Sequence, residues 1–446
     1  MARQKTAAQR TMKLGMVELA MIIVLVFLTT LFGSAGGRNV FAGGFAIPPQ
    51  TAKAESMGGA ATAGVDDPSA VYVNPAALTE IDGNQIISGF TYINTISSVR
   101  NSGVTSRNLH DDDFLPNLFA NYHVDNSNVS FGIGSYAPFG LAVSYKPDSF
   151  TRYAATRTEL KTIFVTPAIA WQPFSSLSIG AGFSFVHSSG LLARALFFGP
   201  FGDGKLRLTD TDNAYGYNFG LLIKPAENLR LGVTYRSRVN VGFDSADVKF
   251  TDASGAGGRT TTVKATGLHL PLPSEINLGT HWQVTPNWGL EFEYNFTRWS
   301  EFEHLKASFT PSLSALGGLA PIGGFFIPQH WHDTNTLRLG TSYKLNQSLE
   351  LRGGLALDET PIPANNLGPA IPGADYLCFS GGLGYHWRRL KMDLGYMAVF
   401  YKTRRVRNTV LETGDNPAAI PFPGVPGKDK HKIFQNLIGL HVGYTF

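Results

Sequence analysis

Cysteine and charge are both scarce in this chain. Only one cysteine, Cys378, occurs in 446 residues, so no disulfide can form within the chain and stability has to come from hydrogen bonds and packing. Charged residues make up 16% of the sequence, whereas soluble domains have about a quarter. Glycine (49 residues) and aromatic residues (12%) are abundant instead. This balance indicates an all-β protein with little water-facing surface.

Long apolar runs are scarce as well. The clearest run, Leu19 to Phe32, has 14 residues and is shorter than the ~20 that cross a bilayer as a helix. Basic residues precede it and small residues follow it, which is the pattern of a secretory signal peptide. We expect residues 1–42 to be that signal, cleaved after Ala42 or after Ala35; a retained anchor is the alternative.

The net charge belongs to this predicted signal. Removing residues 1–42 takes away five basic residues and one acidic residue, which leaves 32 of each sign. The formal charge of +4 is therefore no argument for nucleic-acid binding. An exported chain with no second long apolar run is either a soluble periplasmic or secreted protein, or an outer-membrane β-barrel.

Alternation of apolar and polar residues favours the barrel. In WGLEFEYNF, residues 288–296, the apolar side chains fall on one face of a strand, and Glu291 and Glu293 fall on the other. The same period of two runs through 229–243 and through the segments that begin at Thr336 and Leu390. A barrel strand in lipid has this pattern because one face meets hydrocarbon and the other meets the lumen.

The spacing of these runs predicts fourteen strands. We place them at about 84–100, 114–124, 128–138, 158–172, 177–190, 206–224, 229–247, 261–284, 288–307, 331–345, 349–357, 375–388, 390–405 and 434–446, with six short connections and seven long ones. Outer-membrane barrels have short periplasmic turns and long external loops. Strands in hydrocarbon must also close on themselves, because lipid offers backbone groups no hydrogen-bond partner. The sequence therefore predicts a 14-stranded antiparallel transmembrane β-barrel over residues 84–446.

Residues 43–83 precede the first predicted strand and lack strand alternation. They are rich in alanine and glycine, and they are too apolar for a disordered tail. A lumen of this width needs filling, and large barrels are often plugged. We expect the segment to form a plug, or hatch, inside the lumen. Phe45 and Ile47, near its start, are candidate hatch residues.

Several sequence blocks resemble one family. DDPSAVYVNPAAL at 66–78 resembles the plug motif of the long-chain fatty acid transporter family, the FadL and TodX-like outer-membrane proteins. This resemblance makes Asn74, Pro75 and Ala76 candidate hatch residues. Further similar blocks are SYAPFGLAVSY at 135, RYAATRTELKTIFVTPAIAW at 152, LPSEINLGTHW at 272, YNFTRWSEF at 294 and RGGLALDETPIP at 352. The resemblance covers essentially the whole chain after the signal. It implies a monomeric barrel, closed by an N-terminal hatch, that takes up hydrophobic molecules passively across the bacterial outer membrane.

The resemblance also implies that the substrate leaves sideways, through a gap in the wall at a kinked third strand. The third predicted strand contains Gly132, Gly134, Pro138 and Gly140. Proline donates no ladder hydrogen bond and glycine weakens pairing, so these four residues are candidates for the gap. The alternative is that Pro138 merely ends the strand.

Two long loops are unusually apolar. The segment 191–202 has one basic residue, Arg194, before the aspartate at 203, and SLSALGGLAPIGGFF at 312–326 has no charge. We expect these loops to catch an apolar substrate outside the cell, since burying one leucine-sized group contributes ~1.5–3 kcal/mol. The alternative is that they pack only on each other. The candidate substrate contacts are Leu191, Leu192, Leu196, Phe197, Phe198, Phe201, Leu316, Leu319, Ile322, Phe325 and Phe326, with Arg194 at the mouth.

Whether the substrate carries a carboxylate depends on the arginines of the lumen. Alternation places Arg236, Arg238, Arg338 and Arg352 inside, and it places Glu291, Glu293 and Asp393 there too. The arginines therefore either bind substrate, with Arg236 and Arg238 as the first candidates, or are paired with these acids. VHSSGLLARAL at 186 and PGADYLCFSGG at 372 depart from the more polar family pattern and favour an uncharged hydrocarbon. Fatty acids and aromatic or aliphatic hydrocarbons both stay open.

Other functions have weaker support. Neither GxSxG nor HExxH occurs, so we expect no enzyme, with an outer-membrane lipid hydrolase as the remote alternative. HDDDF at 110 and HWHD at 330 are expected to be solvated, so we expect neither a metal nor a cofactor. KTRRVR at 402 and KDKHK at 428 either bridge lipopolysaccharide phosphates or are simply solvated.

Overall fold

The structure is a computed structural model that describes residues 44–47, 49–101, 103–110, 112–197, 202–251, 260–313, 322–406 and 429–446. The predicted signal peptide lies outside these residues, as do four predicted substrate contacts, Phe198, Phe201, Leu316 and Leu319. The side chains of Phe197 and Ile322 also lie outside the description. Within the described ranges, no helix combines the length and the hydropathy that crossing a bilayer requires.

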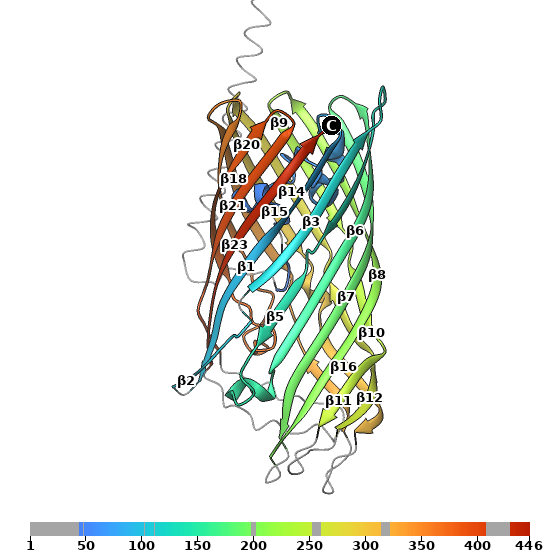
Figure 1. Cartoon of the computed structure of the whole chain (residues 1–446), viewed down its shortest axis with the longest axis vertical. Helices are drawn as coiled ribbons and strands as arrows, with labels where there is room; N and C mark the ends of the chain where they lie inside the picture. The colour runs from blue at the N-terminus through green and yellow to red at the C-terminus, as the bar shows by residue number, and fades with distance from the viewer. Residues whose placement is uncertain are drawn as a thin grey trace, which may run out of the picture. The chain divides into compact units, whose positions relative to one another are not determined.

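Fourteen strands form a closed antiparallel barrel (Figure 1). Each strand pairs with the next one round the wall, and the last pairs with the first from Gln85–Thr445 to Arg100–Lys430. In order they are β1 (Gln85–Asn101), β3 (Asp112–His123), β4 (Val129–Tyr136), β6 (Arg157–Phe174), β7 (Leu177–Phe197), β8 (Asp203–Ala226), β9 (Leu229–Arg236), β14 (Glu275–Thr285), β15 (Trp288–Thr297), β18 (Thr334–Lys344), β19 (Leu349–Asp358), β20 (Tyr376–Trp387), β21 (Leu390–Tyr401) and β23 (Asp429–Thr445). The predicted fourteen-stranded barrel is confirmed.

Shorter elements gather at the end of the barrel that carries the long connections, opposite the C terminus (Figure 1). They include β2 (Val104–Arg107), β5 (Gly140–Ser144), η2 (Phe150–Tyr153), β10 (Val239–Phe243), β11 (Ala246–Thr251), β12 (Thr260–Thr266), β13 (Leu268–Leu272), η4 (Trp299–Glu301), β16 (His304–Leu313), β17 (Ile322–Pro328) and β22 (Arg404–Val406). β10 and β13 form a separate two-stranded sheet. Because short periplasmic turns and long external loops are the rule in such barrels, this end faces outside.

Four predicted strands are interrupted in the structure. The range 229–247 divides into β9, β10 and the start of β11, and 261–284 divides into β12, β13 and β14. The range 288–307 holds β15, η4 and the start of β16, and 390–405 holds β21 and the start of β22. Within the predicted loop 308–330, the described residues belong mainly to the hairpin of β16 and β17. Periodicity alone does not detect these breaks, because each fragment keeps the same period of two on either side of the interruption.

The two faces of the wall differ as the alternation predicts. On β15, Glu291 and Glu293 are buried, while the intervening Leu290, Phe292 and Tyr294 are partly exposed on the outer face. Aromatic side chains pack side by side on that outer face; for example, the ring centroids of Phe183 and Tyr215 lie 5.9 Å apart. The outer surface is therefore apolar, as contact with lipid requires.

The segment before β1 lies inside the barrel, where its helices are visible in blue (Figure 1). It contains α2 (Ala52–Ser56), α3 (Ala70–Val73) and the 3-10 helix η1 (Pro75–Glu80). Thr51 caps α2 by accepting a hydrogen bond from Ala54 N, and Asn74 caps η1 by accepting one from Ala76 N. Helices this short are unstable alone, so contacts with the wall have to hold the hatch in place.

Candidate functional site

Glycine pairs in the wall provide the seats for the hatch. Four cross-strand pairs of glycines face it from opposite sides of the lumen: Gly180–Gly220, Gly232–Gly279, Gly340–Gly354 and Gly395–Gly439. A Cβ placed on any of these eight residues would come within 3 Å of a hatch atom. Side chains here would therefore displace the hatch. Sequence reasoning missed these residues, although a glycine inside a strand is a known sign of close backbone approach.

The predicted hatch motif occupies one of these seats. At Gly180 an added Cβ would lie 2.4 Å from the carbonyl carbon of Pro75, and at Gly220 it would lie 2.1 Å from Oδ1 of Asn74. The Asn74 amide nitrogen donates to Thr62 O at 2.9 Å and to Leu221 O at 3.3 Å. Asn74 therefore joins two parts of the hatch to β8.

Two buried acids hold the middle of the hatch. Glu291 accepts hydrogen bonds from the backbone amides of Ala63 and Gly64 at 2.8 and 3.1 Å. Glu293 accepts from the amides of Ala61 and Thr62 at 3.1 and 3.0 Å. These acids stabilise backbone amides of the segment between α2 and α3 by charge-assisted hydrogen bonds.

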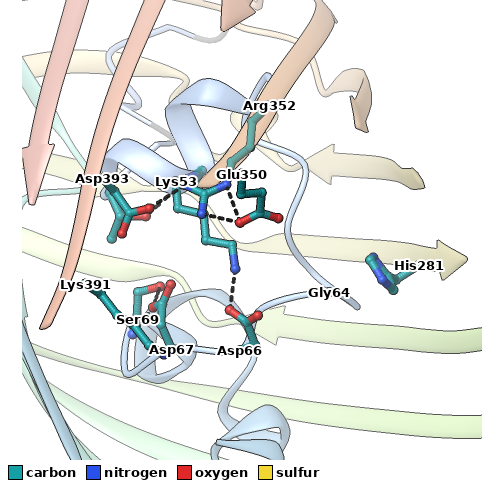
Figure 2. A network of polar contacts seen from close by, with 12 residues as sticks. Lys53, Gly64, Asp66, Asp67, Ser69, His281, Glu350, Arg352, Lys391 and Asp393 are labelled. Atoms are coloured by element: carbon teal, nitrogen blue, oxygen red, sulfur yellow. Dashed lines mark hydrogen bonds and ion pairs between the residues drawn. The ribbon is translucent and has the colours of Figure 1, made fainter. Parts of the chain in front are cut away.

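Two buried arginines form ion pairs with acids inside the barrel, which is one of the two interpretations that the sequence allowed. Arg338 pairs with Glu293, and Arg352 pairs with Glu350 and Asp393 at 2.6 and 2.5 Å. Figure 2 shows the second group beside the ion pair of Lys53 and Asp66, which links α2 to the loop before α3. These guanidinium groups already have carboxylate partners inside the protein.

Arg236 and Arg238 have different surroundings. Arg236 is buried, pairs with Glu275 at 2.8 Å and donates to Tyr72 O at 3.0 Å, so it anchors the hatch. Arg238 does not face the lumen as predicted: its side chain is 44% exposed and its Nε donates to Asn240. The chain is interrupted at Ser237, between β9 and β10, and this interruption reverses the alternation.

The barrel wall is broken between β3 and β5. Pairing of β3 with β4 ends at Leu118–Ser135, and among the described residues β5 pairs with β6 but not with β3. The hatch supplies the missing hydrogen bonds at the kink: Ile47 N donates to Pro138 O at 2.8 Å, and Gly140 N donates to Phe45 O at 3.0 Å. The N-terminal part of the hatch therefore lies against the broken strand.

The four predicted gap residues separate into two groups. Pro138 and Gly140 flank the break. Gly132 and Gly134 do not; they lie in the part of β4 that pairs with both β3 and β6. Their lack of a side chain serves packing instead, since a Cβ on Gly132 would lie 2.6 Å from Val71 of the hatch. Their predicted place at the gap is therefore wrong.

A cavity of about 440 Å³ lies between the hatch and this break. Apolar side chains from the hatch, the kink and the neighbouring strands make up most of its lining, and these include Phe45, Ile47, Leu115, Phe139, Met397 and Val399. Other polar lining groups are neutral, as at Thr95, Ser97 and Gln435. The described lining has two charged side chains, Asp113 and Lys161, and both belong to strands at the break. The volume falls within the ~300–1,000 Å³ typical of small-molecule sites.

An aromatic cluster closes the cavity toward the outside. Phe45 meets Trp299 and Trp331 with ring centroids 4.8 and 5.7 Å apart, and Phe139 lies 6.2 Å from Phe45. The cluster joins the first described residues of the hatch to η4 and to the chain before β18. Movement of Phe45 would therefore disturb both the hatch and the external end.

Three described members of the predicted capture loops, Leu192, Leu196 and Phe325, form part of the apolar interior. Leu196 and Phe325 are buried, and the Arg194 guanidinium lies 5.5 Å from the centre of the Phe325 ring. Leu192 packs against the same apolar cluster, whereas Leu191 falls on the opposite face of β7. Phe326 stacks on His304 at 5.0 Å. Contact of these residues with substrate stays a prediction.

Among the described residues, no group of three or more histidine, cysteine, aspartate and glutamate side chains is arranged to hold a metal ion. Cys378 is buried in the wall.

A closed barrel with an apolar outer face, a hatch bound inside it and a cavity at a break in its wall defines a class, the hatch-closed outer-membrane β-barrels. The family model described as "Outer membrane protein transport protein (OMPP1/FadL/TodX)" matches residues 33–446, and the chain belongs to this family. The family assignment made from the sequence blocks is confirmed.

Relatives and solved structures agree with this assignment. The long-chain fatty acid transport protein of Escherichia coli O6:H1 is 27% identical, over 80% of this chain and 85% of its own length. Outer membrane protein P1 of Haemophilus influenzae is 25% identical, over 94% of this chain and 98% of its own length. A FadL homologue of Pseudomonas aeruginosa has a TM-score of 0.75 at 20% identity, covering 91% of this chain and all of its own. The Pseudomonas putida toluene transporter TodX has a TM-score of 0.71 at 18% identity, with the same coverage.

Substitution of a seat glycine is expected to loosen the hatch. In Gly354→Ala the new Cβ would lie 2.1 Å from the backbone carbon of Met57, and overpacking of this kind costs about 1–3 kcal/mol. Gly353→Ala is the matched control, since its Cβ would have no neighbour closer than 3.7 Å. We expect higher ion conductance in planar bilayers and faster proteolysis of the hatch for Gly354→Ala alone. Equal behaviour of the two variants would contradict the role of Gly354 as a contact point for the hatch.

Seating of the hatch is also expected to depend on pH through Glu55. Burial raises the pKa of this α2 carboxyl to about 8, although the hydrogen bonds that it accepts from Thr91 and Gly439 lower the pKa in part. A released, hydrated Glu55 would have its ordinary pKa of about 4.5. The seated form therefore binds the proton more tightly, so seating is strongest below pH 4.5 and weakens as the pH rises to about 8.

Conductance measured between pH 5 and pH 9 tests this dependence. It should rise with pH in the wild type, and Glu55→Gln, which stays neutral and still accepts from Thr91, should flatten that rise. An unchanged pH profile in the variant would assign the titration to another group.

Proposed function

We propose that this protein is a passive channel that takes hydrophobic compounds across the outer membrane and releases them sideways into the lipid. The observation that carries the proposal is the apolar cavity between the hatch and the unpaired edge of β3. A substrate in it has the hatch on one side and the wall break on the other. No energy source is required, because transfer from water to an apolar cavity and then to hydrocarbon is favourable throughout.

The proposed path begins at three apolar side chains near the external end, Leu192, Leu196 and Phe325. Phe45 and Phe139 belong to the same apolar cluster as these side chains, and they also line the cavity. A rearrangement of the hatch between Phe45 and Ala76 would admit the substrate, and the break beside Pro138 and Gly140 would release it. We propose one barrel as the working unit, because the ring of strands is closed by its own β1–β23 pairing.

Long-chain fatty acids are the first candidate substrates and hydrocarbons the second. Relatives named as long-chain fatty acid transport proteins and a structural neighbour named as a toluene transporter support these two classes. The mainly apolar lining of the cavity and the carboxylate-paired arginines favour recognition of the apolar chain over that of a charged head group. Hydrolysis of a lipid is not part of this proposal, since the family consists of transport proteins.

Binding of oleate, an uncharged alkane of similar length and toluene to the purified barrel tests the substrate class. We expect oleate and the alkane to bind with similar affinity, because the chain supplies most of the contacts. Arg238→Ala should leave oleate binding unchanged, since this side chain is exposed and bonded to Asn240. Arg236→Ala should weaken the binding of oleate and of the alkane to the same extent, because it releases Tyr72 of the hatch. Selective loss of oleate in either variant would show that a carboxylate is recognised.

Blocking the break tests sideways release. Ala142 lines the cavity from β5, at the edge of the break, and Ala142→Trp should obstruct it. We expect uptake to fall at least about tenfold, equivalent to a barrier increase of about 1.4 kcal/mol, with substrate binding preserved. Ala181→Trp on the fully paired wall of β7 is the control. Unimpaired uptake in Ala142→Trp would rule out this exit.

A further inference from the structure

Five basic side chains share the outer face of the barrel near its external end. They are Arg100 on β1, Arg107 on β2, Arg405 on β22, and Lys430 and Lys432 on β23. These four strands are neighbours, because β1 pairs with β2 and β23, and β22 pairs with β23. We call these five residues the basic patch.

The register sets like charges directly opposite one another. Arg100 and Lys430 are cross-strand partners, and Lys430 is also the partner of Arg405. Arg107 and Lys432 lie opposite the same residue, Ser98, from its two sides. Directly opposed like charges destabilise a sheet. An anionic partner outside the chain would remove this repulsion.

The described part of the chain gives the patch no acid. None of its five residues forms an ion pair with a described residue, whereas the buried Arg236, Arg338 and Arg352 each pair with an acid. Asp429, beside Lys430, is buried and accepts a hydrogen bond from Asn101. Asp112 is exposed but lies opposite Asn94, which is six residues or about 20 Å along β1 from Arg100.

An apolar surface begins directly below the patch. The next outward position after Lys432 on β23 is Phe434, about 7 Å further along the strand. The Phe434 ring lies 5.2 Å from that of Phe400 on β21, and Ile96 on β1 is 57% exposed. The patch therefore lies where the lipid-facing surface gives way to water, at the level of lipid phosphate groups.

We propose that the basic patch binds the phosphate groups of an anionic glycolipid of the outer leaflet, lipopolysaccharide, whose acyl chains lie along Phe434, Phe400 and Ile96. Arginine binds phosphate through two parallel hydrogen bonds, and lysine adds a point charge. The long-connection end faces outside, so this lipid meets the patch in its own leaflet. The site is separate from the substrate cavity and does not depend on the transport proposal.

The test compares binding of purified lipid A to the full-length barrel in detergent, measured by native mass spectrometry. The variant Arg100→Gln/Arg405→Gln/Lys430→Gln removes the opposed charges. Each basic residue near an anionic surface contributes roughly fivefold in affinity, so we expect about a hundredfold weaker binding. Lys344→Gln/Arg388→Gln/Arg389→Gln removes three charges at the turn end and should bind as the wild type does. Equal loss in both variants would overturn the site, because net charge alone would then explain it.

Two further arms identify the ligand. Dephosphorylated lipid A should bind the wild type as weakly as lipid A binds the patch variant, and equal binding with and without phosphate would overturn the proposal. Displacement of lipid A by equimolar inorganic phosphate would show that the patch binds free phosphate, and would overturn the proposal that its ligand is a lipid. The charge-retaining Arg100→Lys/Arg405→Lys variant should keep most of the binding, which separates the patch from any folding defect.

Discussion

Backbone hydrogen bonding in a medium without water is the constraint on which the rest of this structure depends. Every peptide group at membrane depth needs a partner inside the protein, and the closed ring from β1 to β23 provides it. The wall break is tolerable because the hatch completes the pairing: Phe45 and Ile47 exchange hydrogen bonds with Gly140 and Pro138. The same segment that fills the lumen therefore also satisfies the interrupted strand, so movement of the hatch and opening of the wall are physically coupled.

The hatch is held by close approach and by charge. Glycine pairs let its backbone touch the wall, and buried acids such as Glu291 and Glu293 bind its amides. Arg338 and Arg352 then neutralise acids that burial would otherwise destabilise. This use of charge explains why the lumen contains several buried arginines although the cavity beside the wall break is lined mainly by apolar side chains. The ionic groups hold the hatch, and the apolar groups line the cavity that we propose for the substrate.

Sequence patterns predicted some of these features and missed others for identifiable reasons. The burial of Glu293 followed from alternation and the presence of a hatch from composition, whereas Asn74 was singled out by its resemblance to a family motif. The outward direction of Arg238 was not predicted, because the interruption at Ser237 reverses the alternation between β9 and β10. Gly132 and Gly134 were assigned to the break because glycine weakens pairing, but here they give room to Val71 of the hatch.

What the sequence by itself determined is the class of protein. Period-two alternation, the order of short and long connections, and an apolar, glycine-rich segment before the first strand are local properties that can be seen in the sequence alone. What only the tertiary structure decided is the place of each contact. The partners Gly354 and Met57, Pro138 and Ile47, or Arg100 and Lys430 are far apart in the chain, and their proximity depends on strand register. Register is set by the closure of the whole ring, which no local stretch of sequence encodes.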